Sequence, residues 1–419
     1  MEMVRIGIVG AGFAAQFHLR ALRRLARSGA EVVGVAASSP QSARAFAARH
    51  HVPQAHPDVA SLLASDVDLV VVAVPTALHE EVTVAAAAAG KHVLVEKPLT
   101  GAFGSGAASA EIAPTERAER ELAAARAAME RITGAVERAG VQLFYAENWV
   151  HAPAVARVRS LLSTSGAPLL DLRAEQSHSG SHASAARRRA SAGGGALLTL
   201  GAHPLATVLH LKAVESGLSG RGPIRPVSVT AETASLHQLV ASHGGDTALV
   251  RDWEDVETWA NLVLAFDDGS RATVTASFQM LGGVRDQLEV YTADAAYRTK
   301  MTQHDELSVF TPDPAAFADQ VLQEKVESAT GWQAVPSDAG WSHGHLQQFE
   351  DVLGALREGR EPLSGLPLAR DTVEIVYSAY LSAARGERVA VGGALPGAAV
   401  DAPHRTSPAL AHSQEAGPR

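Results

Sequence analysis

Two hydrophobic periods alternate along the first hundred residues. Short β-branched runs such as Val4–Val9 and residues 67–74 predict buried strands. Between them, apolar residues three or four apart, such as Leu19 and Leu22, predict helices. Near-continuous apolar strands between helices are typical of a parallel sheet covered on both faces, so this region predicts a doubly wound α/β fold. The expected strands are 4–9, 31–36, 67–74 and 92–95, and the expected helices are 13–28, 40–50 and 80–89.

The pattern changes after residue 100. Residues 101–118 begin with small residues and predict a surface loop or lid, followed by a long helix over 116–138 and a strand over 141–145. Beyond Asn148 the strands cluster, and Asp267-Asp268-Gly269 between two of them is a hairpin signal. Clustered strands predict an α+β domain with a large, mostly antiparallel open sheet. The expected strands are 169–176, 228–236, 260–266, 271–278 and 287–292, and the expected helices are 152–162, 345–356 and 368–384.

The domain organisation follows from these patterns. We expect a first domain over residues 1–147 and a second over 148–391. The segment 392–419 is rich in Gly, Ala, Pro and Ser and is expected to be a disordered tail.

Composition narrows the class of protein. The 419 residues carry 36 Lys and Arg against 45 Asp and Glu, a formal charge of −9, which argues against a general nucleic-acid binder. The chain has no cysteine, which excludes disulfides and thiolate metal sites. Its longest apolar region, residues 67–77, is interrupted by Asp68 and Pro75 and is too short to span a membrane. With no targeting segment apparent, the sequence predicts a cytoplasmic protein with no membrane partner.

A glycine motif follows the first predicted strand. Gly10, Gly12 and Ala15 form a G-x-G-x-x-A pattern, with Phe13 and Ala14 between them, at the start of a predicted helix. The first glycine permits a tight turn, the second lets a pyrophosphate approach the backbone, and the small third residue lets helix and strand pack closely. The alternative is an ordinary glycine turn. The strand, turn and helix context favours a dinucleotide site.

The end of the second predicted strand bears on the choice of coenzyme. An acidic residue there would favour NAD, but this chain has Ser38 and Ser39 instead. Neither repels a 2′-phosphate, and Arg44 lies further along, so the sequence leans slightly to NADP over NAD. The alternative is that these serines only cap the helix that starts at Pro40.

Further motifs match one family in order and spacing. They are Pro75 with His79, the segment Gly90-Lys-His-Val-Leu-Val-Glu96-Lys97-Pro98, Tyr145-Ala-Glu147-Asn148, and the glycine-rich run from Gly193 to His203. Through these residues the chain resembles the Gfo/Idh/MocA family, relatives of glucose–fructose oxidoreductase and inositol dehydrogenase. The resemblance covers roughly residues 3–390, with 101–118 and the tail outside the common pattern.

The resemblance implies an NAD(P)-dependent oxidoreductase of sugars, polyols or their derivatives. It implies a Rossmann domain followed by a domain with an open sheet, which commonly packs against a second subunit, so a homodimer or homotetramer is expected. It also implies that Pro75, His79, Glu96 and Lys97 contact the coenzyme.

The resemblance places the family's lysine at Lys97 and its acid/base histidine at His203. Oxidising a carbinol requires a base for the hydroxyl proton and benefits from a nearby cation. The alternatives are a solvated lysine and a core histidine. The other lysines read as surface residues: Lys91, Lys212, Lys300 and Lys325.

One position departs from the family pattern. The family often has an acid four residues before the histidine, on the same helical face, where this chain has Thr199. Threonine can orient a substrate hydroxyl but cannot ionise, which points to a different substrate geometry or to an altered catalytic role.

Polar residues of the second domain are candidates for substrate contact. Glu147 and Asn148 could position substrate or the nicotinamide ring, or Asn148 could simply cap a helix. His178 and His182 lie in a loop that either recognises a polyhydroxylated ligand or is simply polar. A metal site would need a third ligand besides these histidines, so no metal is expected. Tyr145 and Trp149 are expected to pack. The basic run 187–189 either binds an anionic sugar or phosphate or, as favoured here, is a solvated loop. His345 matches a family region near the substrate cleft, but an ordinary helical surface position is slightly favoured.

Three functions remain open from the sequence. The first is an NAD(P)-dependent oxidoreductase of a sugar, polyol or cyclitol derivative. The second is redox-assisted glycoside cleavage with a bound coenzyme. The third is a non-catalytic nucleotide-sensing protein, motivated by Thr199.

Overall fold

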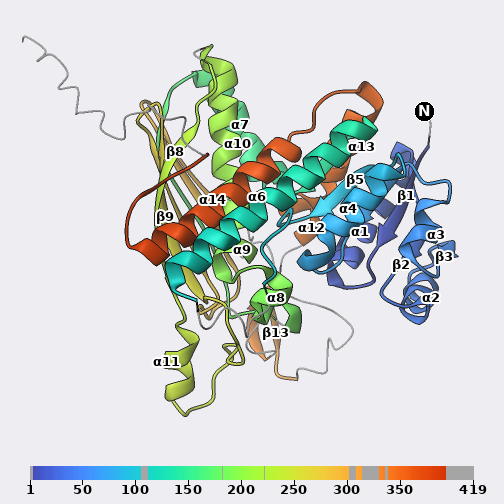
Figure 1. Ribbon diagram of the computed structural model, residues 1–419, viewed down its shortest axis with the longest axis horizontal. Helices are drawn as coiled ribbons and strands as arrows, with labels where there is room; N and C mark the ends of the chain where they lie inside the picture. Colours follow the sequence, from blue (N-terminus) through green and yellow to red (C-terminus); the bar gives the residue numbers. More distant parts are fainter. Residues whose placement is uncertain are drawn as a thin grey trace, which may run out of the picture.

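The computed structural model describes residues 3–104, 112–181, 183–220, 222–301, 308–313, 330–335 and 338–392. Its described strands form two large sheets and a small two-stranded one (Figure 1). The blue N-terminal sheet with α1 to α4 lies at one side of the view, and the long strands β8 and β9 lie at the other.

The first sheet has six strands in the order β3-β2-β1-β4-β5-β6, and every pair is parallel. The N-terminal doubly wound fold is therefore confirmed. Its strands are β1 (Val4–Val9), β2 (Ala30–Ala36), β3 (Gln54–Ala55), β4 (Leu69–Val72), β5 (His92–Glu96) and β6 (Leu143–Ala146). The helices between them are α1 (Phe13–Arg24), α2 (Pro40–Arg49), α3 (Val59–Leu63), α4 (His79–Ala88) and α6 (Pro114–Ala139), with short turns η1 (Ala26–Ser28) and η2 (Thr76–Leu78).

The second sheet has seven strands in the order β12-β11-β7-β10-β9-β8-β15. All of its pairs are antiparallel except β7 with β10, which confirms the mostly antiparallel sheet. The segment Asp267–Gly269 lies in the β9–β10 hairpin, as predicted, and Gly269 takes a φ of 92° there. The strands are β7 (Leu169–Ser177), β8 (Pro226–Ala234), β9 (Trp259–Phe266), β10 (Arg271–Ser277), β11 (Arg285–Thr292), β12 (Ala296–Lys300) and β15 (Val389–Ala390). A separate ribbon pairs β13 (Ser308–Thr311) with β14 (Gly331–Ala334).

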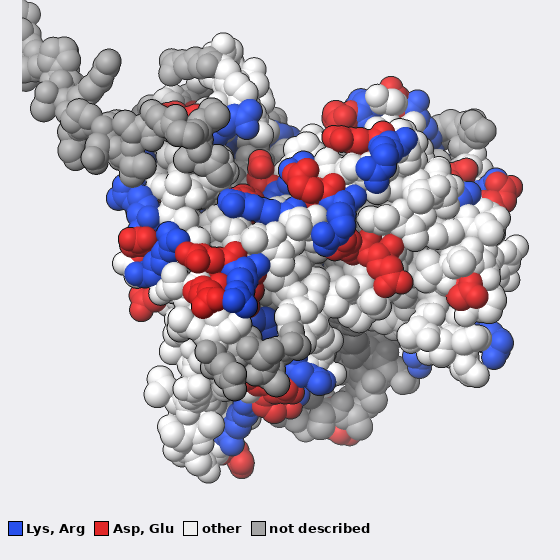
Figure 2. All heavy atoms as spheres, in the orientation of Figure 1, with Lys and Arg blue, Asp and Glu red and all other residues white. Residues whose placement is uncertain are grey.

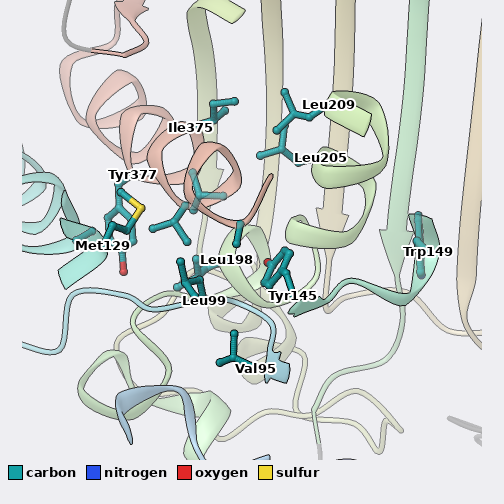
Figure 3. Close-up of a cluster of buried hydrophobic side chains, with 14 of the residues drawn as sticks. Val95, Leu99, Met129, Tyr145, Trp149, Leu198, Leu205, Leu209, Ile375 and Tyr377 are labelled. Atoms are coloured by element: carbon teal, nitrogen blue, oxygen red, sulfur yellow. The ribbon is translucent and has the colours of Figure 1, made fainter. Parts of the chain in front are cut away.

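One continuous core joins the two sheets. Side chains of α6 and of α14 (Leu366–Arg385) meet there with Val95 of β5, Leu99 in the loop that follows it, and Leu205 of the helix Ala202–Ser219 (Figure 3). The remaining described helices are α7 (Pro153–Ser165), α8 (Arg189–Ala192), α9 (Ala196–Thr199), α10 (Ala202–Ser219), α11 (His237–Ser242), α12 (Ala339–Ser342) and α13 (His345–Glu358), with turns η3 (Asn148–His151) and η4 (Ser184–Arg187).

The chain returns to the first sheet near its end. Helix α13 packs Phe349, Val352 and Leu353 into the same buried cluster as Ile6 and Leu22 of the N-terminal region. Residues that the sequence assigns to the second domain therefore cover part of the six-stranded parallel sheet. As a result, the start of α13 lies at the junction between the two large sheets.

Helix α10 was not among the expected elements. Its apolar residues surround it rather than forming one stripe, and residues 202–212 are all buried, so no helical period marks it. The interpretation of Lys212 as a surface residue is wrong: its side chain is 1% exposed and pairs with Glu215 and, at 2.7 Å, with Asp268. The carboxylates compensate the buried ammonium group.

The segment 101–118 is only partly a loop. Gly101 and Ala102 are buried, and the Ala102 backbone N–H donates to the Tyr377 hydroxyl at 2.6 Å. Helix α6 already begins at Pro114. Residues 105–111 of this segment and residues 393–419 of the expected tail lie outside the described part of the chain.

Charges of both signs are mixed over α6 and α14 on the face drawn in Figure 2. Arg126 pairs with Glu374, and Arg370 pairs with Glu130, across the two helices. In the described ranges no single helix is long and apolar enough to cross a membrane; only the bent pair Arg189–Thr199 with Ala202–Ser219, taken together, meets that test.

Candidate active site

A pocket of about 260 Å³ lies between the glycine turn, the end of β5 and the second sheet. It holds both residues that the family resemblance singles out for catalysis, Lys97 and His203. Three larger hollows, of about 440, 700 and 910 Å³, contain neither of them. The pocket is lined by Phe13, Ala14, Phe17, Glu96, Lys97, Asn148, Trp149, Gln176, His178, Leu200, His203, Val284, Asp286, His343 and His345.

The glycine motif forms the turn from β1 into α1. At Gly10, with a φ of 126°, an added Cβ would lie 2.1 Å from the carbonyl oxygen of Ala73, so only glycine fits. At Gly12 an added Cβ would meet nothing within 4 Å, which leaves open space in front of the helix. Ala15 is fully buried, Ala14 and the 64% exposed Phe13 line the pocket, and no side chain caps α1. This end of α1 therefore presents uncapped backbone N–H groups beside open space.

The two serines after β2 differ in their roles. Ser39 caps α2, since its hydroxyl accepts from the Ser42 backbone N–H at 3.1 Å. Ser38 is exposed, as is Arg44 on α2. The capping alternative therefore describes Ser39, and only Ser38 stands clear of the helix cap.

His79 lies beneath the loops rather than in the pocket. Its ring is 1% exposed, with Nδ1 2.8 Å from the Pro98 carbonyl oxygen and Nε2 3.0 Å from that of Val74. Burial lowers the pKa of His79, and the two carbonyl oxygens, which accept hydrogen bonds from the ring, oppose that shift. His79 therefore ties the Lys97-Pro98 segment to the loop that holds the exposed Pro75.

Glu96 joins α1 to the end of β5. One of its carboxylate oxygens lies 2.7 Å from Nε2 of the buried His18, and the other accepts from the Lys97 backbone N–H at 3.0 Å. Burial alone would raise the pKa of Glu96, but the bond to His18 and the charge of Lys97 outweigh it and lower the pKa to about 2. Glu96 is therefore an anion at the pocket wall.

Lys97 reaches across to the glycine-rich segment. Its Nζ donates to the backbone carbonyl of Thr199 at 2.6 Å. The Thr199 hydroxyl itself donates to the Gly195 carbonyl at 2.7 Å, and α9 ends at Thr199 before α10 begins at Ala202. The expectation that Thr199 and His203 share one helical face is wrong, because the helix is interrupted between them. Thr199 contributes its carbonyl, not its side chain, to the Lys97 ammonium.

His203 is held by residues that follow β6. Its Nδ1 lies 2.6 Å from Oε1 of Glu147, and its ring stacks on Trp149 with the ring centres 5.6 Å apart. Burial lowers the pKa of His203, Glu147 opposes that shift, and Lys97 adds to it. With Nδ1 engaged, Nε2 is the nitrogen available to the pocket. Trp149 is a packing residue, as expected, and the ring it packs on is that of His203.

The start of α13 supplies a further wall of the pocket. His345 is half-buried and lines the pocket, with its ring centre 5.4 Å from that of Phe17, which agrees with the alternative that it lies near the substrate cleft. Burial lowers its pKa to about 3. Gly344 has a φ of 87°, and a Cβ there would be 2.3 Å from the carbonyl oxygen of Asn148. Gly344 was the signal available in the sequence for this close approach.

Polar groups of the second sheet form the opposite wall. Gln176 of β7 donates to Asp286 of β11 at 3.1 Å, and both side chains are buried. His178 accepts from the Gly180 backbone N–H and packs on Phe278. Sequence reasoning missed Gln176 and Asp286, because only strand pairing brings them together.

Asn148, His178 and His182 are the remaining residues predicted to contact substrate. Asn148 donates to the His343 carbonyl at 2.7 Å, while Glu147 caps η3. The pocket thus includes Asn148 and His178, and His182 lies outside the described residues. In the part of the chain that the structure describes, no three His, Asp or Glu side chains could hold a metal ion.

The pocket combines the Lys97 ammonium, the His203 imidazole with one ring nitrogen facing inward, and other hydrogen-bonding side chains. All of them lie beside the glycine turn between β1 and α1, which is the kind of turn that binds phosphates. A hydroxyl placed between Lys97 and His203 could lose its proton to the imidazole while the ammonium group stabilises the oxygen.

Comparison with known proteins agrees with this geometry. Residues 4–122 match the family described as "Oxidoreductase family, NAD-binding Rossmann fold", and residues 166–298 match the "GFO/IDH/MocA C-terminal domain". Over 404 residues the chain is 28% identical to the "Putative UDP-kanosamine synthase oxidoreductase subunit" of Amycolatopsis mediterranei, covering 94% of this chain and 99% of that protein.

Two more relatives are similar to the chain over different extents. Inositol 2-dehydrogenase of Acidothermus cellulolyticus is 44% identical over 97 residues, which are 23% of this chain and 28% of that protein. The structure of GenD2 from gentamicin A biosynthesis in complex with NAD superimposes with a TM-score of 0.72 at 25% identity, covering 94% of this chain and 97% of that one. Together the two matched domains, their order and the pocket between them identify the chain as a member of the Gfo/Idh/MocA family of NAD-dependent oxidoreductases.

Proposed function

We propose that this protein transfers a hydride between a nicotinamide coenzyme and a hydroxyl-bearing carbon of a sugar, polyol or cyclitol derivative. The observation that carries the proposal is the meeting of Lys97 and His203 in one pocket beside the Gly10–Ala15 turn. The inositol 2-dehydrogenase name of one relative supports this substrate class. A screen of sugars, polyols and cyclitols with NAD⁺ and NADP⁺, followed by absorbance of the reduced coenzyme, tests it. Absence of turnover on the whole panel would argue against it.

The residues present fit such a coenzyme. The open space in front of Gly12 leaves room for a pyrophosphate, and the uncapped start of α1 offers N–H donors to it. We infer that Gly10, Gly12, Phe13, Ala14 and Ala15 hold the diphosphate side. Glu96 and Lys97 face the nicotinamide end, and Pro75 and His79 act through the loops around it.

The chain's own groups handle the proton. The coenzyme, when bound, accepts or returns the hydride. The Lys97 ammonium, held by the Thr199 carbonyl, stabilises the alkoxide oxygen in this proposal. Nε2 of His203 takes the hydroxyl proton during oxidation and returns it during reduction. Thr199 therefore acts through its backbone.

Replacing Gly10 and Gly12 by alanine, one at a time, distinguishes the effect on the folded turn from the effect on coenzyme binding. Gly12→Ala should leave the thermal unfolding midpoint unchanged, because its Cβ meets no protein atom, but weaken coenzyme binding at least about tenfold by occupying the phosphate space. Gly10→Ala should also lower the unfolding midpoint, since its Cβ collides with Ala73. Fluorescence titration with reduced coenzyme and thermal unfolding check both. Unchanged affinity in Gly12→Ala would contradict the proposed coenzyme site.

We infer that NADP is accepted as well as NAD, with a slight preference for NADP. Neither Ser38 nor Ser39 repels a 2′-phosphate, and the exposed Arg44 lies on the helix that follows. Titration with NADPH and NADH measures the preference, and Arg44→Ala should weaken NADPH binding only. Tighter binding of NADH would overturn the preference and leave the reaction class intact.

The polar wall supports a substrate rich in hydroxyl groups. Asn148, Gln176 and His178 bring amide and imidazole groups to the pocket, opposite the aromatic rings of Phe13 and Phe17. Substrate hydroxyls can bond to these polar side chains, while the C–H faces of the substrate pack on the two aromatic rings.

The Glu147–His203 pair bears on the non-catalytic alternative, which was motivated by the absence of an acid at Thr199. It argues against that alternative, because the histidine has an acidic partner from another part of the chain.

We further propose that the protein assembles as a homodimer or homotetramer through the open face of the second sheet. Charged and hydroxyl side chains form a shallow hollow there, including Arg173, Glu175, Thr273 and Arg285. Light scattering coupled to size exclusion measures the state, and a monomer at micromolar concentration would contradict it.

A further inference from the structure

Glu147 is a fully buried carboxylate at the edge of the pocket. It lies 0% exposed immediately after β6, accepts from the Trp149 backbone N–H at 3.3 Å and meets Nδ1 of His203 at 2.6 Å. Within the described residues, His203 is its one ion-pair partner, and its second oxygen has no hydrogen-bond partner. Burying a carboxylate is costly unless a donor compensates it, so the contact with His203 is the main support for this charge.

The contact determines which ring nitrogen carries the proton. An ionised carboxylate only accepts hydrogen bonds, so Nδ1 of His203 must be the N–H and Nε2 must keep its lone pair. The stack on Trp149, with 14° between the ring planes, holds the plane of the imidazole, and the contact with Glu147 distinguishes its two orientations within that plane. Both constraints aim an unprotonated Nε2 at the pocket, as a general base requires.

Thr199 cannot do this in place of an acid. Its hydroxyl is committed to the Gly195 carbonyl, and the break between α9 and α10 separates it from the His203 helix. Its carbonyl is committed to Lys97. The side chain at this position therefore holds the turn, while the carboxylate for the histidine comes from a distant part of the sequence.

We propose that Glu147 is the positioning residue for His203, taking over from the end of β6 the role that an acid at position 199 would have. The proposal rests on the proposed function, in which His203 exchanges the substrate proton. During oxidation the O–H and C–H bonds break and the C=O bond forms. The proton moves to Nε2, the hydride moves to the oxidised coenzyme, and Glu147 stabilises the resulting imidazolium without taking its proton.

The charged and titratable groups around His203 set the direction of its pH response. Glu147 and Glu96 raise the pKa of the ring, whereas Lys97 and burial lower it, and the neutral His345 belongs to the same pocket. Removing the charge of Glu147 should therefore lower the pKa of His203 further. An amide at position 147 can also donate, which permits the opposite tautomer with the proton on Nε2.

The kinetic test is Glu147→Gln, which keeps the size of the side chain and removes its charge. We expect kcat/KM for oxidation to fall about 100-fold, with its acidic limb moved to lower pH and coenzyme affinity unchanged. Asp268→Asn is the matched control: it removes a carboxylate that pairs with buried Lys212 outside the pocket, and it should leave the pH profile unmoved. A Glu147→Gln enzyme with a wild-type profile and rate would overturn the proposal.

A second measurement does not depend on turnover, and it does not require that the Glu147 variant folds. In a ¹⁵N–¹H spectrum of the histidine rings of the full chain, the signal absent from His203→Gln identifies His203. The proposal expects a neutral ring protonated at Nδ1, with its N–H proton shifted downfield by the carboxylate. Protonation at Nε2 would overturn it. If the ring is protonated at Nδ1 but no substrate of the screen is turned over, the result would count against the proposed function and not against the role of Glu147.

Discussion

Lys97→Ala is expected to lower kcat by about 10² to 10⁴-fold while coenzyme affinity stays within a few-fold of wild type. The ammonium group is the cation that the structure fixes inside the pocket, through the Thr199 carbonyl, and alanine leaves no charge to stabilise the alkoxide oxygen. The coenzyme's diphosphate is expected to be held by the backbone of the glycine turn, so its binding should survive. Steady-state kinetics on the best substrate of the screen and a fluorescence titration measure the two effects.

Lys91→Ala is the matched control. Lys91 precedes the same strand but bonds to the Ser65 carbonyl at 3.2 Å and lies outside the pocket. Its loss should leave kcat unchanged. Equal activities of wild type and Lys97→Ala would remove Lys97 from the reaction, and equal losses in both variants would point to a general structural effect.

The folded protein should lose stability below pH 6.5 because of two buried histidines. Burial and the charge of Arg159 lower the pKa of His151 and of His210 to about 3. The ordinary value in an unfolded chain is about 6.5, so between these values the unfolded state binds more protons. Each neutral buried ring contributes fully to the free energy of unfolding above pH 6.5. As the pH is lowered below that value, the contribution decreases by up to about 1.4 kcal/mol per pH unit for each histidine.

Urea unfolding at pH 7.5, 6.5 and 5.5 measures this slope. His210→Gln should reduce the loss between pH 6.5 and 5.5 by about 1 kcal/mol, since one protonation of the unfolded chain, already half complete at pH 6.5, is removed. The exposed His243→Gln should leave the slope unchanged. A free energy of unfolding that is independent of pH over this range would show that the two rings are charged or hydrated in the folded state.

Local pattern alone predicted the parts of the fold that local physics decides. Val4–Val9, the glycine turn and the helix after it follow from β-branched runs, positive φ at Gly10 and helical spacing, all within a few residues. The Asp267–Gly269 hairpin is equally local. Motif order also indicated Lys97 and His203, which the structure brings to one pocket. Their catalytic roles and the domain boundary near residue 147 stay predictions.

The remainder depended on contacts between distant segments. Helix α10 is apolar all round, so no period distinguished it, and the burial of Lys212 depends on carboxylates from two elements. His345 reaches the pocket because Gly344 lets α13 approach the loop after β6.

By itself, the sequence determined the class of fold, the glycine turn and the candidate pair Lys97 and His203. Only the tertiary structure decided what surrounds that pair. The Lys97 ammonium bonds to a backbone carbonyl at Thr199, and the acid beside His203 is Glu147, 56 residues earlier in the chain. The physical reason is that a hydrogen bond depends on distance in space, and residue identity at one position does not reveal which remote group the fold brings within 3 Å.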